Sequence, residues 1–402
     1  MLERPISKAG WTRVAFGDVV RLSKARVADP EAAGIERVVG LEHIEPGDLR
    51  IRRWGDVADG TTFTTLFKPG QVLFGKRRAY QRKVAVADFE GVCSGDIYVL
   101  EPANGRLMPE LLPFLCQTDA FFDHAVGTSA GSLSPRTNWT SLASFEFLLP
   151  PIQEQARLVE ALSAAVNAKD ALDDAAHWLS ISQLASLDSL MRGLDLGETR
   201  QHPQVGRFFC GWEPVYLADL LILSQYGLSE EATSSGRYPM LRMMNVEAGK
   251  VVENDLKYID LPDTEFQRYR LLPGDVLFNR TNSYELVGRT GTYDLEGEHV
   301  FASYLVRLRA NDDLLLPEYL TAFLNCEVGR RQVMAFATRG VSQANVNASS
   351  LQKVVVPLPP IEHQRKVVEI IDTNRASLTA LKARSNFIRD LISRIANGGF
   401  SE

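Results

Sequence analysis

Two short stretches of the sequence are rich in side chains that can hydrogen-bond to nucleic-acid bases. They run from Gly75 to Lys83 (GKRRAYQRK) and from Asn279 to Arg289 (NRTNSYELVGR), and each follows a β-rich VLF segment. Arginine can donate two hydrogen bonds to guanine, and asparagine or glutamine can bond adenine, so such a loop could read base edges. The remaining cations would neutralise phosphates. The alternative is a solvated charged loop at the edge of a sheet.

A second pair of polar stretches, residues 127–139 (GTSAGSLSPRTNW) and 338–350 (TRGVSQANVNASS), precedes two long helical patterns. Their small residues and amides would allow close approach to phosphates, but Ser and Asn serve equally well in turns and helix caps. The candidate DNA-binding residues of all four stretches are polar or aromatic: Lys76, Arg77, Arg78, Tyr80, Gln81, Arg82, Lys83, Arg136, Asn138, Asn279, Arg280, Thr281, Asn282, Tyr284, Arg289, Arg339, Gln343 and Asn347.

The sequence offers little for catalysis or metal binding. It contains no GxGxxG, P-loop or HExxH motif. It also lacks the Asn/Asp-Pro-Pro-Tyr/Phe signature with which amino-methyltransferases hold a flipped base. The six histidines occur at unrelated spacings, and the four cysteines are scattered singly without a CxxC. We therefore expect no catalytic residue, no metal site and no cofactor on this chain.

The polar stretches must be positioned by a duplicated scaffold. A proline-rich helix opener occurs twice with the same spacing (359 − 150 = 209), and proline suits a first helical turn. Its repeated members are Pro150, Pro151, Ile152 and Gln155, which recur as Pro359, Pro360, Ile361 and Gln364.

Apolar residues after each opener alternate at spacings of four and three, which is the seam pattern of a coiled coil. A pair of ordinary amphipathic helices on separate cores is the alternative. The predicted seam residues are Leu158, Leu162, Leu172, Leu179, Val367, Ile371, Leu378, Leu381, Ile388 and Ile392.

The duplication extends through the whole chain, because KPGQVLFGKR at Lys68 recurs as LPGDVLFNRT at Leu272. Within each copy, short β-rich runs are segregated from helical segments, which predicts an α+β class. We expect two tandem mixed domains, separated and joined by two long antiparallel coiled-coil helices related by a pseudo-twofold axis. The predicted division is 1–150 for the first recognition domain, 151–206 for a spacer helix and linker, 207–357 for the second recognition domain and 358–402 for the distal spacer helix.

Composition narrows the class of protein further. The chain has 402 residues, a hydrophobic content of 45% and a net charge of −6, so any basic surface must be local. No apolar run approaches the roughly 20 residues that span a bilayer. The N-terminal residues have no apolar core typical of a secretion signal. With scattered cysteines, these features predict a cytoplasmic protein without membrane contact.

The chain resembles the specificity subunits of Type I restriction–modification systems. The resemblance is carried by PPIQEQARLV at Pro150, PPIEHQRKVV at Pro359, PGQVLF, and PGDVLFNRTNSYELVGR, and it covers essentially the whole chain. It implies a non-catalytic reader of double-stranded DNA, with one recognition domain for each half of an asymmetric split site. It also implies antiparallel spacer helices that dock two modification subunits, which bind S-adenosylmethionine and methylate adenine, and a further restriction subunit.

The resemblance leaves the recognised bases and the existence of a nuclease partner open. One alternative is a coiled-coil adaptor of another methyltransferase-based defence complex without a nuclease partner. Helices of about 40 residues would be roughly 60 Å long, and would act as a ruler between the half-sites. Because the chain is acidic overall, we expect the isolated subunit to bind DNA weakly and with strong salt dependence.

Overall fold

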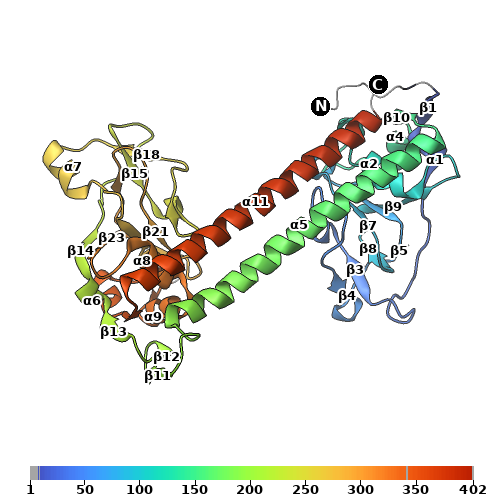
Figure 1. Cartoon of the computed structure of the whole chain (residues 1–402). Coiled ribbons are helices and arrows are strands. Elements are labelled where there is room, and N and C mark those ends of the chain that lie inside the picture. The colour runs from blue at the N-terminus through green and yellow to red at the C-terminus, as the bar shows by residue number, and fades with distance from the viewer. Residues whose placement is uncertain (1–7, 9, 341–342, 401–402) are drawn as a thin grey trace. The chain divides into compact units, whose positions relative to one another are not determined.

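The computed structural model describes residue 8, residues 10–340 and residues 343–400, apart from the side chains of Leu184 and Arg339. The chain divides into two compact units (Figure 1). Unit 1 comprises residues up to Ala175 together with those from Leu381 onward, and unit 2 comprises Ala176–Ala380. Each unit therefore holds one α+β module and a part of each long helix. No helix in the described part of the chain is long and apolar enough to cross a membrane.

Unit 1 contains two four-stranded sheets, ordered β2-β9-β6-β7 and β4-β3-β8-β5, and a separate antiparallel pair of β1 with β10. Strand β6 pairs antiparallel with both β7 and β9, so an inner strand of the first sheet carries the VLF segment. The strands are β1 (Thr12–Ala15), β2 (Val20–Leu22), β3 (Arg37–Val39), β4 (Gly55–Asp56), β5 (Thr65–Phe67), β6 (Val72–Gly75), β7 (Val84–Val86), β8 (Gly91–Cys93), β9 (Ile97–Pro102) and β10 (Glu146–Leu149).

Short helices pack around the sheets of unit 1. Phe74 on β6 meets Phe121 at a ring-centroid distance of 5.5 Å, and Phe16 meets Phe121 at 4.8 Å, so aromatic packing fills this core. The helices are α1 (Phe16–Val19), η1 (Leu41–His43), η2 (Val57–Asp59), η3 (Ala79–Gln81), η4 (Pro109–Leu111), α2 (Leu112–Leu115), α3 (Asp119–Gly127) and α4 (Trp139–Ala143).

Unit 2 contains a six-stranded sheet, β14-β23-β19-β21-β17-β16, and two three-stranded sheets, β18-β15-β22 and β20-β25-β24. The strands of these sheets are β14 (Leu221–Tyr226), β15 (Tyr238–Leu241), β16 (Val246–Glu247), β17 (Lys250–Val251), β18 (Lys257–Ile259), β19 (Val276–Asn279), β20 (Thr281–Asn282), β21 (Thr290–Thr292), β22 (Val300–Phe301), β23 (Leu305–Ala310), β24 (Thr338–Arg339) and β25 (Ala344–Asn345). Its helices are α6 (Leu217–Leu220), η5 (Met243–Asn245), α7 (Asp263–Tyr269), α8 (Pro317–Asn325), α9 (Glu327–Ala335) and α10 (Ala348–Leu351).

Two further strand pairs complete unit 2. Strand β13 (Glu213–Tyr216) pairs antiparallel with β26 (Val355–Leu358), as β1 pairs with β10 in unit 1. Strands β11 (Thr199–His202) and β12 (Gly206–Phe209) form a hairpin in the segment that composition predicts as a linker. Val205 and Phe208 of this hairpin are buried in the unit 2 core. These two apolar side chains anchor an otherwise polar segment to unit 2.

The two long helices are α5 (Ile152–Arg192) and α11 (Ile361–Phe400). In unit 1, the Ser385 hydroxyl of α11 donates to Asp173 Oδ1 of α5 at 2.5 Å. Near the other end, a side chain at Gly399 would lie 3.3 Å from Leu158 Cδ1, so the helices run antiparallel within this unit. In unit 2, Ile371 of α11 packs against the core cluster that includes Met191 of α5.

The glutamine of each helix opener, Gln155 or Gln364, hydrogen-bonds its long helix to the module that precedes it in the sequence. Gln155 is 1% exposed, and its side chain accepts from the Met108 N–H at 2.9 Å and donates to the carbonyls of Arg106 and Pro150 at 2.7 and 2.9 Å. Gln364 makes the corresponding three hydrogen bonds in unit 2. The repeated glutamine therefore satisfies main-chain groups that burial would otherwise leave unpaired.

The sequence-based fold class is confirmed as a mixed α+β protein, and the long helix expected after Pro151 is confirmed at 152–192. The seam residues all lie buried or half-buried in their own units, with Leu162, Val367 and Ile392 buried. Supercoiling of the helix pair and the pseudo-twofold relation of the two domains stay predictions.

Candidate nucleic-acid interface

In unit 1 the two polar stretches predicted from the sequence lie side by side. Arg77, just after β6, forms an antiparallel β-bridge with Arg136, which in turn bridges Ala130. The Thr137 N–H donates to the Lys76 carbonyl at 3.0 Å, and the Arg78 N–H donates to the Pro135 carbonyl at 2.7 Å. Main-chain hydrogen bonds thus join two segments that lie about 60 residues apart in the sequence. Together they form a small antiparallel ribbon of residues 76–78 and 135–137.

A carboxylate holds two of these arginines together. Arg136 Nε lies 2.8 Å from Asp96 Oδ1, and Arg77 Nη1 lies 3.2 Å from Asp96 Oδ2. Burial raises the pKa of Asp96, but the hydrogen bonds and charges of Arg136 and Arg77 outweigh it, so the pKa lies below its ordinary value. Two guanidinium groups thus share one carboxylate, so this cluster of three side chains keeps a net positive charge.

Arginine side chains also hydrogen-bond to a serine beside the ribbon. Arg77 Nη2 and Arg78 Nη2 both donate to the Ser134 hydroxyl, at 3.0 and 3.3 Å. Arg78 adopts the left-handed backbone conformation, with φ of 53°. Leu133 beside this cluster is 88% exposed and Tyr80 is 57% exposed. The ribbon therefore presents cations, an apolar side chain and a tyrosine to solvent.

Other candidates in this loop bind back to the module. Arg82 Nη2 donates to the Gln117 carbonyl at 2.9 Å and pairs with Asp119 at 2.7 Å, and its guanidinium lies 4.6 Å from the Phe122 ring centroid. Lys83 Nζ donates to the Leu41 carbonyl at 2.7 Å. The Gln81 side chain is half-buried. These contacts give Arg82 and Lys83 a role in holding the loop.

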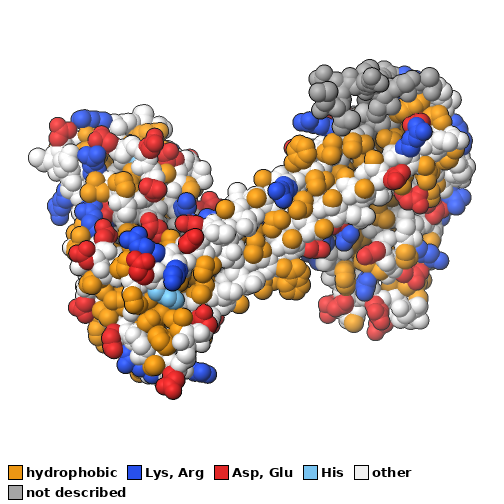
Figure 2. All heavy atoms as spheres, viewed as in Figure 1, with side chains coloured by type: hydrophobic (Ala, Val, Ile, Leu, Met, Phe, Trp, Pro, Cys, Tyr) orange, Lys and Arg blue, Asp and Glu red, His pale blue; other side chains and the backbone are white. Residues whose placement is uncertain are grey.

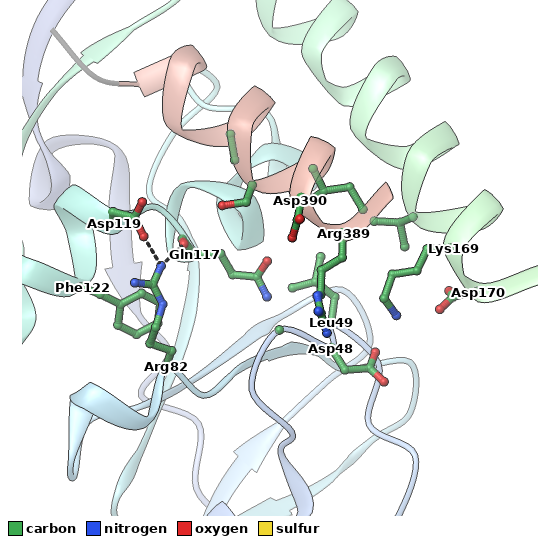
Figure 3. Close-up of a pocket in the computed structure, with 15 residues that line it drawn as sticks. Asp48, Leu49, Arg82, Gln117, Asp119, Phe122, Lys169, Asp170, Arg389 and Asp390 are labelled. Atoms are coloured by element: carbon green, nitrogen blue, oxygen red, sulfur yellow. Dashed lines mark hydrogen bonds and ion pairs between the residues drawn. The ribbon is translucent and has the colours of Figure 1, made fainter. Parts of the chain in front are cut away.

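Figure 3 shows Arg82 reaching Asp119 at the edge of a cleft of about 300 Å³ between the unit 1 module and its two helix segments. Lys169 and Asp170 come from α5, and Arg389 and Asp390 from α11. The charges of its lining nearly balance, so nothing here marks a site for a strongly charged ligand.

Unit 2 repeats the arrangement with other side chains. Strand β20 pairs with β25, which pairs with β24, so the two polar stretches again form a ribbon. Asn345 Nδ2 donates to the Thr281 hydroxyl at 2.7 Å, and Asn345 Oδ1 accepts from Arg280 Nη2 at 3.1 Å. The Arg280 guanidinium also lies 4.8 Å from the centroid of the Tyr226 ring.

The remaining unit 2 candidates divide between surface and core. Tyr284 is 45% exposed, and Arg289 and Gln343 are exposed. Asn282 is half-buried and its side chain accepts from the Ser283 N–H at 2.8 Å. The backbone of Arg339 lies in β24, while its side chain is outside the described part of the structure.

One candidate is incompatible with DNA contact. Asn279 ends β19 with no exposed surface, and its Nδ2 donates to the Met243 carbonyl at 3.3 Å. A buried amide cannot reach a ligand outside the module. The expectation for Asn279 was wrong because the residue lies on the core-facing side of the strand that it ends.

Two further candidates are helix caps. Asn138 Oδ1 accepts from the Ser141 N–H at 2.8 Å at the start of α4, and Asn347 Oδ1 accepts from the Ser350 N–H at 2.7 Å at the start of α10. Both side chains stay exposed. The capping alternative left open by the sequence accounts for their positions.

Residues 127–131 also match the GxSxG pattern of serine hydrolases. In those enzymes the serine lies on a sharp turn between a strand and a helix. Here Ser129 follows helix α3, and its hydroxyl donates to the Ala125 carbonyl at 2.7 Å. The geometry therefore gives this serine no nucleophilic role.

Asp96, Asn345 and Tyr226 were not among the residues predicted from the sequence. Asp96 lies before a strand in a segment without other polar candidates, and Tyr226 lies far from the loops in sequence. Asn345 lies within one of the predicted polar stretches. Its position in the repeat could have identified it, because it corresponds to the candidate Arg136 (345 − 136 = 209).

A family model described as the Type I restriction modification DNA specificity domain matches residues 210–387. Two curated relatives match along most of their length. The Type I restriction enzyme EcoKI specificity subunit of Escherichia coli K12 is 27% identical over 96% of this chain and 86% of the relative. The Type I restriction enzyme StySPI specificity subunit of Salmonella potsdam is 24% identical over 90% of this chain and 81% of the relative.

Two solved structures share the fold. One comes from work on complex assembly and conformational transition of the type I R-M system, with a TM-score of 0.59 and 20% identity, covering 97% of this chain and 96% of that one. The other is a Type I restriction–modification S subunit from M. genitalium, with a TM-score of 0.56 and 12% identity, covering 100% and 98%. The family model thus places a Type I restriction modification DNA specificity domain at residues 210–387, and the curated relatives extend the similarity to Type I specificity subunits over most of the chain.

Proposed function

We propose that the chain reads double-stranded DNA for a Type I restriction–modification complex, with each module binding one half of a split, asymmetric site. One observation carries the proposal: both modules build the same ribbon from the same two segments and place different polar side chains on it. Two half-sites of different sequence require a constant scaffold with changed reading residues. The overall charge of −6 supports weak DNA binding by the chain alone, with partner subunits supplying phosphate contacts.

Exposed aromatic residues on the long helices support docking of partner subunits there. Trp178 on α5 and Phe387 on α11 are each 68% exposed, and they occupy the same position of the repeat (387 − 178 = 209). Figure 2 shows further apolar side chains along these helices. Exposed aromatics are enriched at protein interfaces, and two equivalent positions suit two copies of one partner. We take this partner to be the modification subunit.

In this proposal the chain itself does no chemistry. The modification subunits bind S-adenosylmethionine and methylate adenine, restriction subunits join to cut DNA, and the assembly acts in the cytoplasm. The recognition ribbons contribute hydrogen-bond donors, acceptors and positive charge, which are the properties that base reading requires.

Methylome sequencing of the host tests the proposal. With the chain present, we expect an adenine-methylated motif in two parts separated by unread bases, and deletion of the chain should abolish it. Complementation with the wild-type chain is the control. An unchanged methylome after deletion would refute the proposal. Methylation that persists in the assembled complex without restriction of incoming DNA would favour the adaptor of a complex lacking a nuclease.

A further inference from the structure

The two ribbons can be superimposed residue by residue through their main-chain hydrogen bonds. The Lys76 N–H donates to the Asp96 carbonyl at 3.0 Å, and the Arg280 N–H donates to the Tyr304 carbonyl at 3.0 Å. On the other side of the same residues, the Thr137 N–H donates to the Lys76 carbonyl, and the Val346 N–H donates to the Arg280 carbonyl. Lys76 and Arg280 are therefore equivalent positions.

This equivalence fixes the residues that face each other on the ribbon. Arg77 opposes Arg136 in unit 1, and Thr281 opposes Asn345 in unit 2. The main chain is shared, whereas the facing pair changes from two guanidinium groups to a hydroxyl and an amide. The residue whose carbonyl accepts from this position also differs, because Asp96 in unit 1 corresponds to Tyr304 in unit 2. Only Asp96 offers a carboxylate to the facing arginines.

Arg136 retains the donors needed for a bidentate contact. Asp96 occupies Nε at 2.8 Å and one side of Nη2 at 3.5 Å. Since an arginine has five N–H donors, both donors of Nη1 and one of Nη2 remain, and they form the outer edge of the fork. The Arg136 side chain is 50% exposed. Arg77 is less free, because its two terminal nitrogens already bond Asp96 and Ser134.

Asn345 is held in a comparable way. Its Nδ2 donates one hydrogen bond to the Thr281 hydroxyl, and its Oδ1 accepts one hydrogen bond from Arg280. One N–H donor of Nδ2 and one lone pair of Oδ1 remain on this amide. An amide edge with one donor and one acceptor matches N7 and N6 of adenine, whereas a fork of donors matches N7 and O6 of guanine.

We propose that residues 136 and 345 are the equivalent base-reading positions of the two modules. Arg136 reads a guanine and Asn345 reads an adenine, each from the major groove. Asp96 and Arg77 position the first, and Arg280 and Thr281 position the second. This inference rests on the proposed DNA-reading function and assigns that function to particular atoms.

The test uses the assembled complex of this chain with its modification subunits, and duplexes bearing the split motif found by methylome sequencing. Each guanine is replaced in turn by 7-deazaguanine, which lacks the N7 acceptor but keeps Watson–Crick pairing. At one guanine of one half-site, the wild-type complex should lose affinity about tenfold or more. The Arg136→Ala complex should show no additional loss there, while a guanine elsewhere still responds. The matched scan with 7-deazaadenine should couple one adenine of the other half-site to Asn345→Ala.

Arg136→Lys keeps the charge without the bidentate fork, so it should hold affinity for nonspecific duplex but lose the guanine preference. Co-purification with the modification subunits shows that each variant is folded. If the wild-type complex binds its site and no 7-deaza position couples to residue 136 or 345, the base-reading assignment is wrong. If the wild-type complex shows no preference for any sequence, the proposed function itself fails.

Discussion

Replacing Gln364 with alanine should loosen the junction between α11 and the unit 2 module. Gln364 has no exposed surface, and its side chain accepts from the Leu316 N–H at 2.9 Å. It also donates to the carbonyls of Leu314 and Pro359 at 2.8 and 2.9 Å. Alanine would leave these three main-chain groups without their partner and would create a small cavity.

A buried polar group left unpaired costs about 1–3 kcal/mol. Three such groups therefore lower the free energy of unfolding of unit 2 by about 3 kcal/mol at the low end of that range. Gln155→Ala removes the same three bonds in unit 1, so we expect a similar loss there. Gln153→Ala, at an exposed position in the same helical turn as Gln155, is the matched control and should change stability by less than about 0.5 kcal/mol.

Amide hydrogen exchange separates the two junctions. In Gln364→Ala the Leu316 amide should exchange faster while the Met108 amide keeps its protection, and Gln155→Ala should show the converse. Urea unfolding supplies the accompanying free-energy change. Wild-type protection at both amides in both variants would show that the glutamines do not hold these junctions, and would refute the reasoning.

Three further predictions concern the helices and the unit 1 ribbon. Ile371→Asp places a charge against the unit 2 core cluster and should cost several kcal/mol in urea unfolding; an unchanged midpoint would mean that this helix segment does not pack there. Trp178→Ala and Phe387→Ala should each lower the number of modification subunits that co-purify with the chain. If both variants still co-purify with two modification subunits, the partner does not dock on these helix positions. Because the folded-state pKa of Asp96 lies below its ordinary value, its ion pairs stabilise the fold above about pH 4 and are lost as pH falls through the lowered pKa. Asp96→Asn should therefore destabilise the protein near neutral pH but not near pH 2, measured by urea unfolding across that range, and an equal effect at both pH values would contradict the ion-pair account.

Much of the scaffold could be predicted from the sequence because its signals are local. The proline opener, the alternating apolar spacing and the VLF strands are patterns within one turn or one strand, and duplication presents each of them twice. The candidate site was also predicted from local composition, because Arg, Asn and Gln can hydrogen-bond to base edges, although a solvated charged loop has the same composition. The prediction was weaker where one residue type serves two roles, as for Asn138 and Asn347, which cap helices.

The sequence alone determined the repeat, the two long helices, the mixed α+β class and the segments that carry the polar candidates. Tertiary structure decided which candidates meet. Arg77 and Arg136, like Thr281 and Asn345, face each other only because the main chain pairs segments about 60 residues apart. Other tertiary contacts bury Asn279 at the end of β19 and bind Arg82 to its own module. The types of side chain and their local spacing can be read from the sequence. Which of those side chains share a surface depends on hydrogen bonds between segments that are distant in the sequence.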